Sequence, residues 1–60
     1  MKPFEYGTWH VWQGTAHVIV SDQSSGELSY FKDCDAAINW LYLRDKPAAR
    51  ALNAHKKVTP

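Results

Sequence analysis

Hydrophobic and polar positions alternate along two short segments near the start of the chain. Thr8–Trp12 and Ala16–Val20 are rich in β-branched and aromatic residues, which is typical of half-buried strands. Glu27–Phe31 is a third segment of this kind, and it follows the turn-forming cluster Asp22–Gly26. These segments predict an antiparallel sheet of three strands, connected in chain order.

A helical repeat replaces the alternation after residue 33. Four apolar positions share one helical face, at i, i+3, i+4 and i+7 spacing: Cys34, Ala37, Ile38 and Leu41. Asp33 or Asp35 can cap the start of this helix. Asp45 would fall on the apolar stripe and Pro47 lacks a backbone donor, so the helix is predicted to kink or break near Pro47.

The predicted fold class is α+β, with a three-stranded antiparallel sheet and a C-terminal helix, kinked or broken near Pro47, packed on one face. Sixty residues make a single small domain, 1–60, with a thin core, and residues 56–60 are expected to be a frayed tail. A single cysteine forms no internal disulfide, and no apolar run is long enough to span a bilayer. We therefore expect a cytoplasmic protein with no membrane segment.

The turn at Gln13-Gly14 sets the expected register of the first hairpin. A two-residue turn there places Trp9 opposite Val18 on one face, and His10 opposite His17 on the other. The first face is apolar throughout and is assigned to the helix. The other face has nothing in the sequence to cover it. Its expected members are our candidate partner-binding residues: His10, Trp12, His17, Ile19, Leu28 and Tyr30.

An aromatic, nearly uncharged face of this kind is typical of a contact surface. A shift in register, or coverage by Phe4 and Tyr6, would remove it. The charge distribution offers a second candidate surface, because acids predominate up to residue 43 and bases after it, although the net charge is only +1. This basic patch comprises Arg44, Lys46, Arg50, Lys56 and Lys57. It is either the solvated face of a terminal helix or a contact for an acidic partner.

The residue types that catalysis and cofactor binding require do not occur in the patterns they need. Cys34 lies on the apolar stripe of the helix, so a small buried hydrophobe explains it better than a nucleophile. His10 and His17 could face each other across a strand pair, but that face lacks a third metal ligand. We therefore expect no enzyme, no catalytic residues, no cofactor and no metal.

The segment Phe31–Trp40 resembles the strand-to-helix junction of the arm-type DNA-binding domain of tyrosine integrases. In those domains a Phe closes the third of three strands, an Ala sits in the first helical turn, and a Trp lies three residues later. Phe31, Ala37 and Trp40 match this pattern, and Gly7–Trp9 resembles the opening strand. The resemblance implies three strands packed on one helix, with the free sheet face in the major groove of DNA.

The resemblance covers residues 7–43, with one departure: Thr8–Val20 lacks the Arg and Lys that this family places on its sheet. Phosphate contacts dominate DNA affinity. We therefore predict a small non-catalytic binding protein, similar in size to phage and plasmid accessory proteins, that modulates or inhibits a larger protein partner through its aromatic sheet face. A DNA-binding accessory module of the integrase arm-type fold is the first alternative, and a homodimeric structural subunit is the second.

Overall fold

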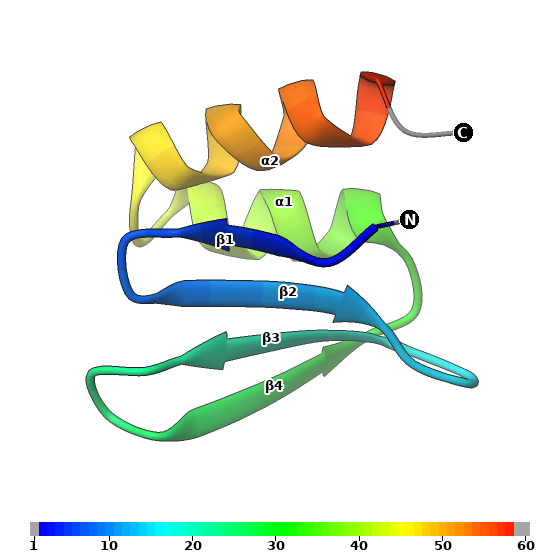
Figure 1. Ribbon diagram of the computed structural model, residues 1–60, viewed down its shortest axis with the longest axis horizontal. Coiled ribbons are helices and arrows are strands. Elements are labelled where there is room, and N and C mark those ends of the chain that lie inside the picture. The colour runs from blue at the N-terminus through cyan, green and yellow to red at the C-terminus, as the bar shows by residue number, and fades with distance from the viewer. Residues whose placement is uncertain (1, 59–60) are drawn as a thin grey trace.

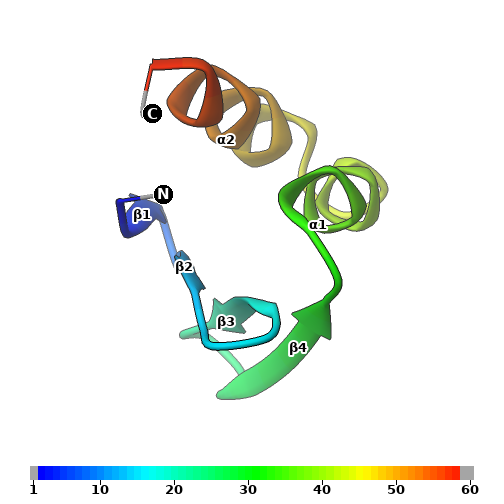
Figure 2. The same ribbon diagram turned by 90° about the vertical axis from the view of Figure 1, so that its right-hand side faces the viewer.

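Four antiparallel strands and two helices make up the computed structural model, which describes residues 2–58 (Figure 1). The strands lie in chain order: β1 (Phe4–Tyr6), β2 (Trp9–Gln13), β3 (Val18–Asp22) and β4 (Glu27–Phe31). The helices are α1 (Cys34–Tyr42) and α2 (Lys46–Val58). In the turned view the strands curve around one side of the molecule and both helices lie on the other (Figure 2).

The predicted three-stranded sheet is wrong, because a fourth strand, β1, precedes the others. Phe4 lies opposite Val11, and Tyr6 lies opposite Trp9. Three residues are too few to show an alternating pattern. The sequence does mark the two-residue turn that follows β1, because it places a glycine there. Gly7 has a φ of +58°, a conformation that favours glycine in hairpin turns.

The C-terminal half forms two helices where the sequence predicted one kinked or broken helix. α1 ends at Tyr42 and α2 begins at Lys46. Each helix starts at an aspartate cap, as the sequence suggested for the first. Asp33 Oδ1 accepts a hydrogen bond from the backbone N–H of Ala36 at 2.8 Å, and Asp45 Oδ1 accepts one from the backbone N–H of Ala48 at 3.2 Å.

The predicted register of the first hairpin is also wrong. A four-residue loop, 14–17, joins β2 to β3, so Trp12 lies opposite Ile19 rather than near Thr15. A Cβ atom at Gly14 would come within 3.1 Å of the His17 carbonyl oxygen, so this loop closes tightly at a glycine. Because the register moves by four residues, an even number, the side chains of both strands keep their predicted faces.

The core lies between the inner face of the sheet and the helices. The predicted apolar stripe of α1 faces it, with Ala37 and Leu41 fully buried and Cys34 and Ile38 half-buried. The small side chains of Ala48 and Ala49 allow α2 to pack closely against the rest of the core. The buried apolar residues are Phe4, Trp9, Val11, Val18, Val20, Ala37, Leu41, Ala48, Ala49 and Leu52.

His55 on α2 holds the new strand β1 against the helices. Its ring lies 5.2 Å from the ring of Phe4, and its Nε2 lies 2.9 Å from the carbonyl oxygen of Lys2. Residues 56–58, expected to belong to a frayed tail, form the last turn of α2 in the structure. The remaining two residues of that expected tail, Thr59 and Pro60, lie outside the described residues.

Candidate binding surface

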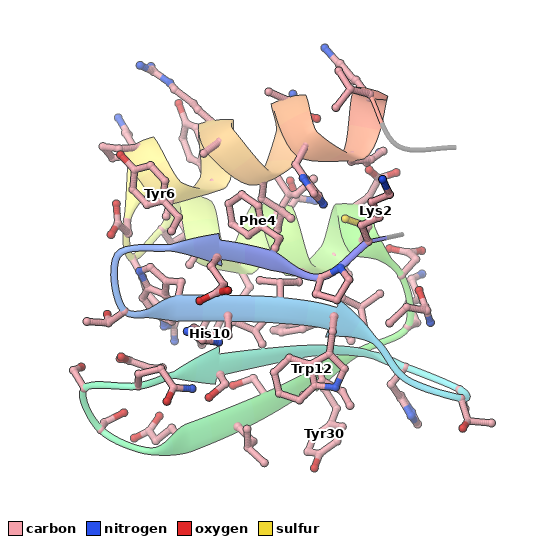
Figure 3. The ribbon with its side chains drawn as sticks, in the orientation of Figure 1. Lys2, Phe4, Tyr6, His10, Trp12 and Tyr30 are labelled. Atoms are coloured by element: carbon pink, nitrogen blue, oxygen red, sulfur yellow. The ribbon has the colours of Figure 1, made fainter. Side chains whose placement is uncertain are left out.

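A row of three large side chains crosses the outer face of the sheet, away from the helices. Trp12 of β2 lies opposite Ile19 of β3, which lies opposite Tyr30 of β4. Directly opposed residues of antiparallel strands have Cβ atoms about 4.5–5.5 Å apart, so these side chains form one continuous surface. Figure 3 shows Trp12 and Tyr30 near each other at one end of this face.

A second, more polar row runs beside the first. It crosses all four strands through Glu5, His10, Ser21 and Leu28. His10 Nε2 lies 3.3 Å from Glu5 Oε1, and the Ser21 hydroxyl accepts a hydrogen bond from the Gln23 amide at 2.8 Å. The sequence analysis missed Glu5, because its place opposite His10 depends on β1.

His17 reaches the same surface from the loop rather than from a strand. Its ring packs edge-on against Tyr30, with 6.0 Å between the ring centroids. The predicted cross-strand pair of histidines does not form, because His10 lies opposite Ser21. The structure thus brings together all six predicted partner-binding residues. We call this surface the outer-face patch: His10, Trp12, His17, Ile19, Leu28 and Tyr30.

No helix or strand within residues 2–58 covers the outer-face patch. Tyr30 is 59% exposed and Leu28 is 51% exposed, both high for large apolar side chains. Phe4, which could have covered this face, is instead buried in the core with 7% exposure. The four strands contain no Lys or Arg. The patch is therefore open and aromatic, and its strands supply no Lys or Arg.

Arg44, the first residue of the predicted basic patch, packs against the aromatic part of the core. Its guanidinium carbon lies 3.8 Å from the centroid of the Trp40 ring. Trp40 in turn meets Trp9 edge-on at 5.9 Å and Phe31 at 5.4 Å. Such a stacked guanidinium contributes about 0.5–1 kcal/mol at an exposed site, so Arg44 has a structural role here.

The other four basic residues belong to α2. Lys56 forms an ion pair with Asp35 of α1, and this hydrogen bond raises the pKa of the Lys56 amine. Lys46, Arg50 and Lys57 are exposed. The predicted patch is therefore divided between two structural contacts, at Arg44 and Lys56, and three cations that face solvent.

The surroundings of Cys34 disfavour a role as a nucleophile. Burial raises the pKa of the Cys34 thiol, which disfavours the thiolate that nucleophilic catalysis needs. Across residues 2–58, no three His, Cys, Asp or Glu side chains gather as a metal ion would require.

Comparison of the chain with family models, with curated proteins and with solved structures found no match. The resemblance of residues 7–43 to the arm-type domain of integrases therefore stays a prediction. Neither of the described helices is long and apolar enough to cross a membrane.

Proposed function

We propose that this chain is a small non-catalytic binding protein that attaches to a larger protein partner through the outer-face patch. The observation that carries the proposal is the uncovered row Trp12–Ile19–Tyr30, flanked by the half-exposed Leu28. Protein interfaces favour a central aromatic anchor with few charges around it. A partner held there would be modulated or inhibited in the manner of phage and plasmid accessory proteins.

Electrostatics favour protein over DNA as the occupant of this patch. DNA draws most of its non-specific binding energy from phosphate contacts with Lys and Arg. The sheet has neither, and Glu5 places a carboxylate beside His10 on the same face. A duplex laid on this face would meet aromatic rings and a negative charge, so the alternative of an integrase-like DNA contact has little electrostatic support.

A second copy of this chain is an alternative partner, and the exposed edge of the sheet favours it. β4 is an edge strand, with no neighbour on its outer side among the described residues. It carries both Leu28 and Tyr30, the most exposed apolar side chains of the sheet. Antiparallel pairing of two β4 strands would extend the sheet and bring these side chains of the two copies next to each other.

Capture from a lysate of the cells that carry this gene tests the proposal. The bait is the full chain, compared with Trp12→Ala and Tyr30→Ala as patch variants and Leu43→Ala as the matched control, since Leu43 is exposed but lies on the helix side. We expect one larger protein to be captured by the wild type and the control, and lost from both patch variants. Equal capture by all four baits contradicts the proposal, and so does recovery of this chain alone.

A further inference from the structure

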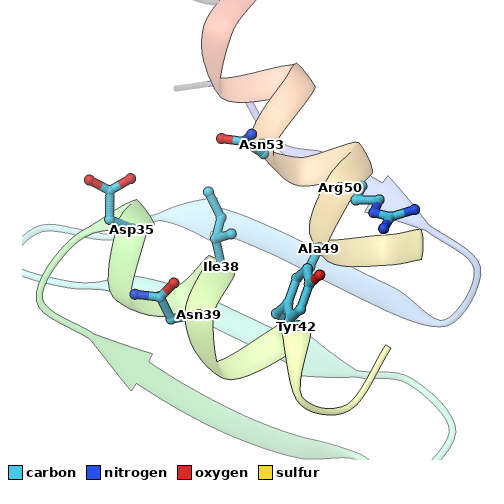
Figure 4. Close-up of a pocket in the computed structure, with 7 residues that line it drawn as sticks. All are labelled: Asp35, Ile38, Asn39, Tyr42, Ala49, Arg50 and Asn53. Atoms are coloured by element: carbon cyan, nitrogen blue, oxygen red, sulfur yellow. The ribbon is translucent and has the colours of Figure 1, made fainter. Parts of the chain in front are cut away.

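A groove of about 460 Å³ lies between α1 and α2 on their solvent side (Figure 4). Its apolar part consists of Ile38 and Tyr42 from α1 and Ala49 from α2. Ala49 is fully buried, so its methyl group only closes the floor of the groove, and Ile38 and Tyr42 present the accessible apolar surface. Three polar side chains complete the lining: Asn39, Arg50 and Asn53.

These three polar side chains are not engaged by the part of the chain that the structure describes. Within residues 2–58 neither the two asparagine amides nor the Arg50 guanidinium makes a side-chain hydrogen bond. Together they offer both donors and acceptors beside an apolar floor. Asp35, the one carboxylate in the lining, is already paired with Lys56. The groove therefore has spare hydrogen-bonding capacity and no spare negative charge.

Positive charge is concentrated along the α2 side of this groove. α2 contains no acidic residue. Lys46, Arg50 and Lys57 are spaced by four and seven positions, which places them on one side of the helix along about 16 Å of its length. Lys46 Nζ also lies 5.3 Å from the centroid of the Tyr42 ring, at the border of the groove. A negatively charged occupant is the one that fits this potential.

The number of cations decides between a nucleic acid and an acidic protein segment. Affinity for DNA depends on how many phosphates Lys and Arg neutralise, and strongly salt-dependent binding goes with about 6–10 such contacts. Arg50 is the one cation in the groove lining, and Lys46 and Lys57 add two more on the same side of α2. A helix with an apolar stripe, in contrast, can fill the space over Ala49 and set its carboxylates beside the cations, which themselves follow a helical spacing.

We propose that the groove between α1 and α2 binds an acidic amphipathic helix of a protein partner. The apolar stripe of that helix packs against Ile38 and Tyr42, above the floor closed by Ala49, and its carboxylates pair with Arg50 and the neighbouring lysines. Asn39 and Asn53 hydrogen-bond polar groups at its edges. This site lies on the helix layer, opposite the outer-face patch, so the two contacts are independent.

The test titrates the labelled full chain with a designed helical peptide of about 15 residues, which has one leucine stripe flanked by glutamates. Binding is followed by NMR through the side-chain NH₂ signals of Asn39 and Asn53. A second peptide with lysine for every glutamate is the control probe. Arg50→Glu reverses a charge in the groove. Lys32→Glu makes the same change outside it, at an exposed position before α1.

We expect the glutamate peptide to shift both asparagine signals in the wild type and in Lys32→Glu. Affinity should fall about tenfold or more for the lysine peptide and for Arg50→Glu, because each puts like charges together. The proposal is overturned if these signals do not move at millimolar glutamate peptide, or if Arg50→Glu binds it as well as the wild type. Tighter binding of a 20-base-pair duplex through the same signals would identify a nucleic-acid site instead.

Discussion

The indole Nε1 of Trp9 donates a hydrogen bond to Asp45 Oδ2 at 3.0 Å, although the two residues lie 36 positions apart. The other oxygen of the same carboxylate caps α2 by accepting from the backbone N–H of Ala48. One side chain thus fixes the start of the second helix and ties the turn between the helices to strand β2. Because the core of so small a domain supplies only about 3–5 kcal/mol of stability, this pair of hydrogen bonds is a large part of what holds the fold together.

Replacing Asp45 by alanine should lower the free energy of unfolding by about 2–3 kcal/mol, since it removes a helix cap and leaves the indole N–H of Trp9 without its partner. Asp45→Asn keeps an acceptor for one of the two donors and should lose less. Urea denaturation followed by Trp fluorescence measures both. A midpoint for Asp45→Ala equal to that of the wild type would show that this carboxylate does not organise the turn.

Leu41 and Leu43 form a matched pair for testing the face of α1. Leu41 has no exposed surface, whereas Leu43 is 84% exposed. We expect Leu41→Ala to cost about 2–5 kcal/mol, enough to unfold much of the population at room temperature, and Leu43→Ala to stay within about 0.5 kcal/mol of the wild type. Thermal denaturation followed by circular dichroism distinguishes them. Similar melting temperatures for the two variants would mean that α1 is rotated relative to the core.

Replacing Phe4 by alanine tests whether strand β1 contributes to the stability of the fold. Its ring packs on His55 and lies opposite Val11, so Phe4→Ala should destabilise the domain by about 3–5 kcal/mol. Glu5→Ala, in the same strand but exposed, should cost at most about 1 kcal/mol, because it loses only a surface contact with His10. Urea midpoints that are the same for both variants would argue that the first residues contribute nothing to the core.

Asp22 gives the protein a defined response to acid. Its Oδ1 accepts hydrogen bonds from the backbone N–H and the hydroxyl of Ser24, at 3.0 and 2.7 Å, and these bonds hold the pKa of the carboxyl below its ordinary value of 3.8. Because the folded pKa is lower than the unfolded one, the ionised carboxylate stabilises the fold above the unfolded pKa. This contribution is lost as the pH falls through the folded pKa.

Asp22→Asn cannot ionise at this position, so its stability should fall less than that of the wild type between about pH 5 and about pH 2. Ser24→Ala, which removes only the hydroxyl donor, should fall in between. Urea midpoints across this range provide the measurement. Parallel acid profiles for all three proteins would show that the turn does not favour the charged form of Asp22.

The sequence predicts the faces of the strands better than their pairing. Trp12 and Ile19 share a face in either register, because alternation has a period of two and the register error was four residues. Gln13-Gly14 indicated a turn correctly, but the tight closure of the loop at Gly14 also depends on the carbonyl of His17, which a local pattern does not reveal.

Two features of the candidate surfaces could not be read from the chain. Glu5 meets His10 only because a three-residue strand pairs with β2, and a strand that short has no periodic signature. Asn39 and Asn53 line one groove only because α1 and α2 lie side by side, which depends on the turn held by Asp45. Periodicity describes single elements, whereas these contacts depend on the packing of two.

Photo-crosslinking from the outer-face patch is the most direct test of the proposed function. A photo-reactive amino acid is placed at position 30, or at position 43 as the control, in cells that carry this gene. Tyr30 is the most exposed residue of the row Trp12–Ile19–Tyr30. Position 30 should therefore crosslink to one larger protein, and position 43 should not. Crosslinks from position 43 to the same protein, or from position 30 only to nucleic acid or to this chain itself, would contradict the account.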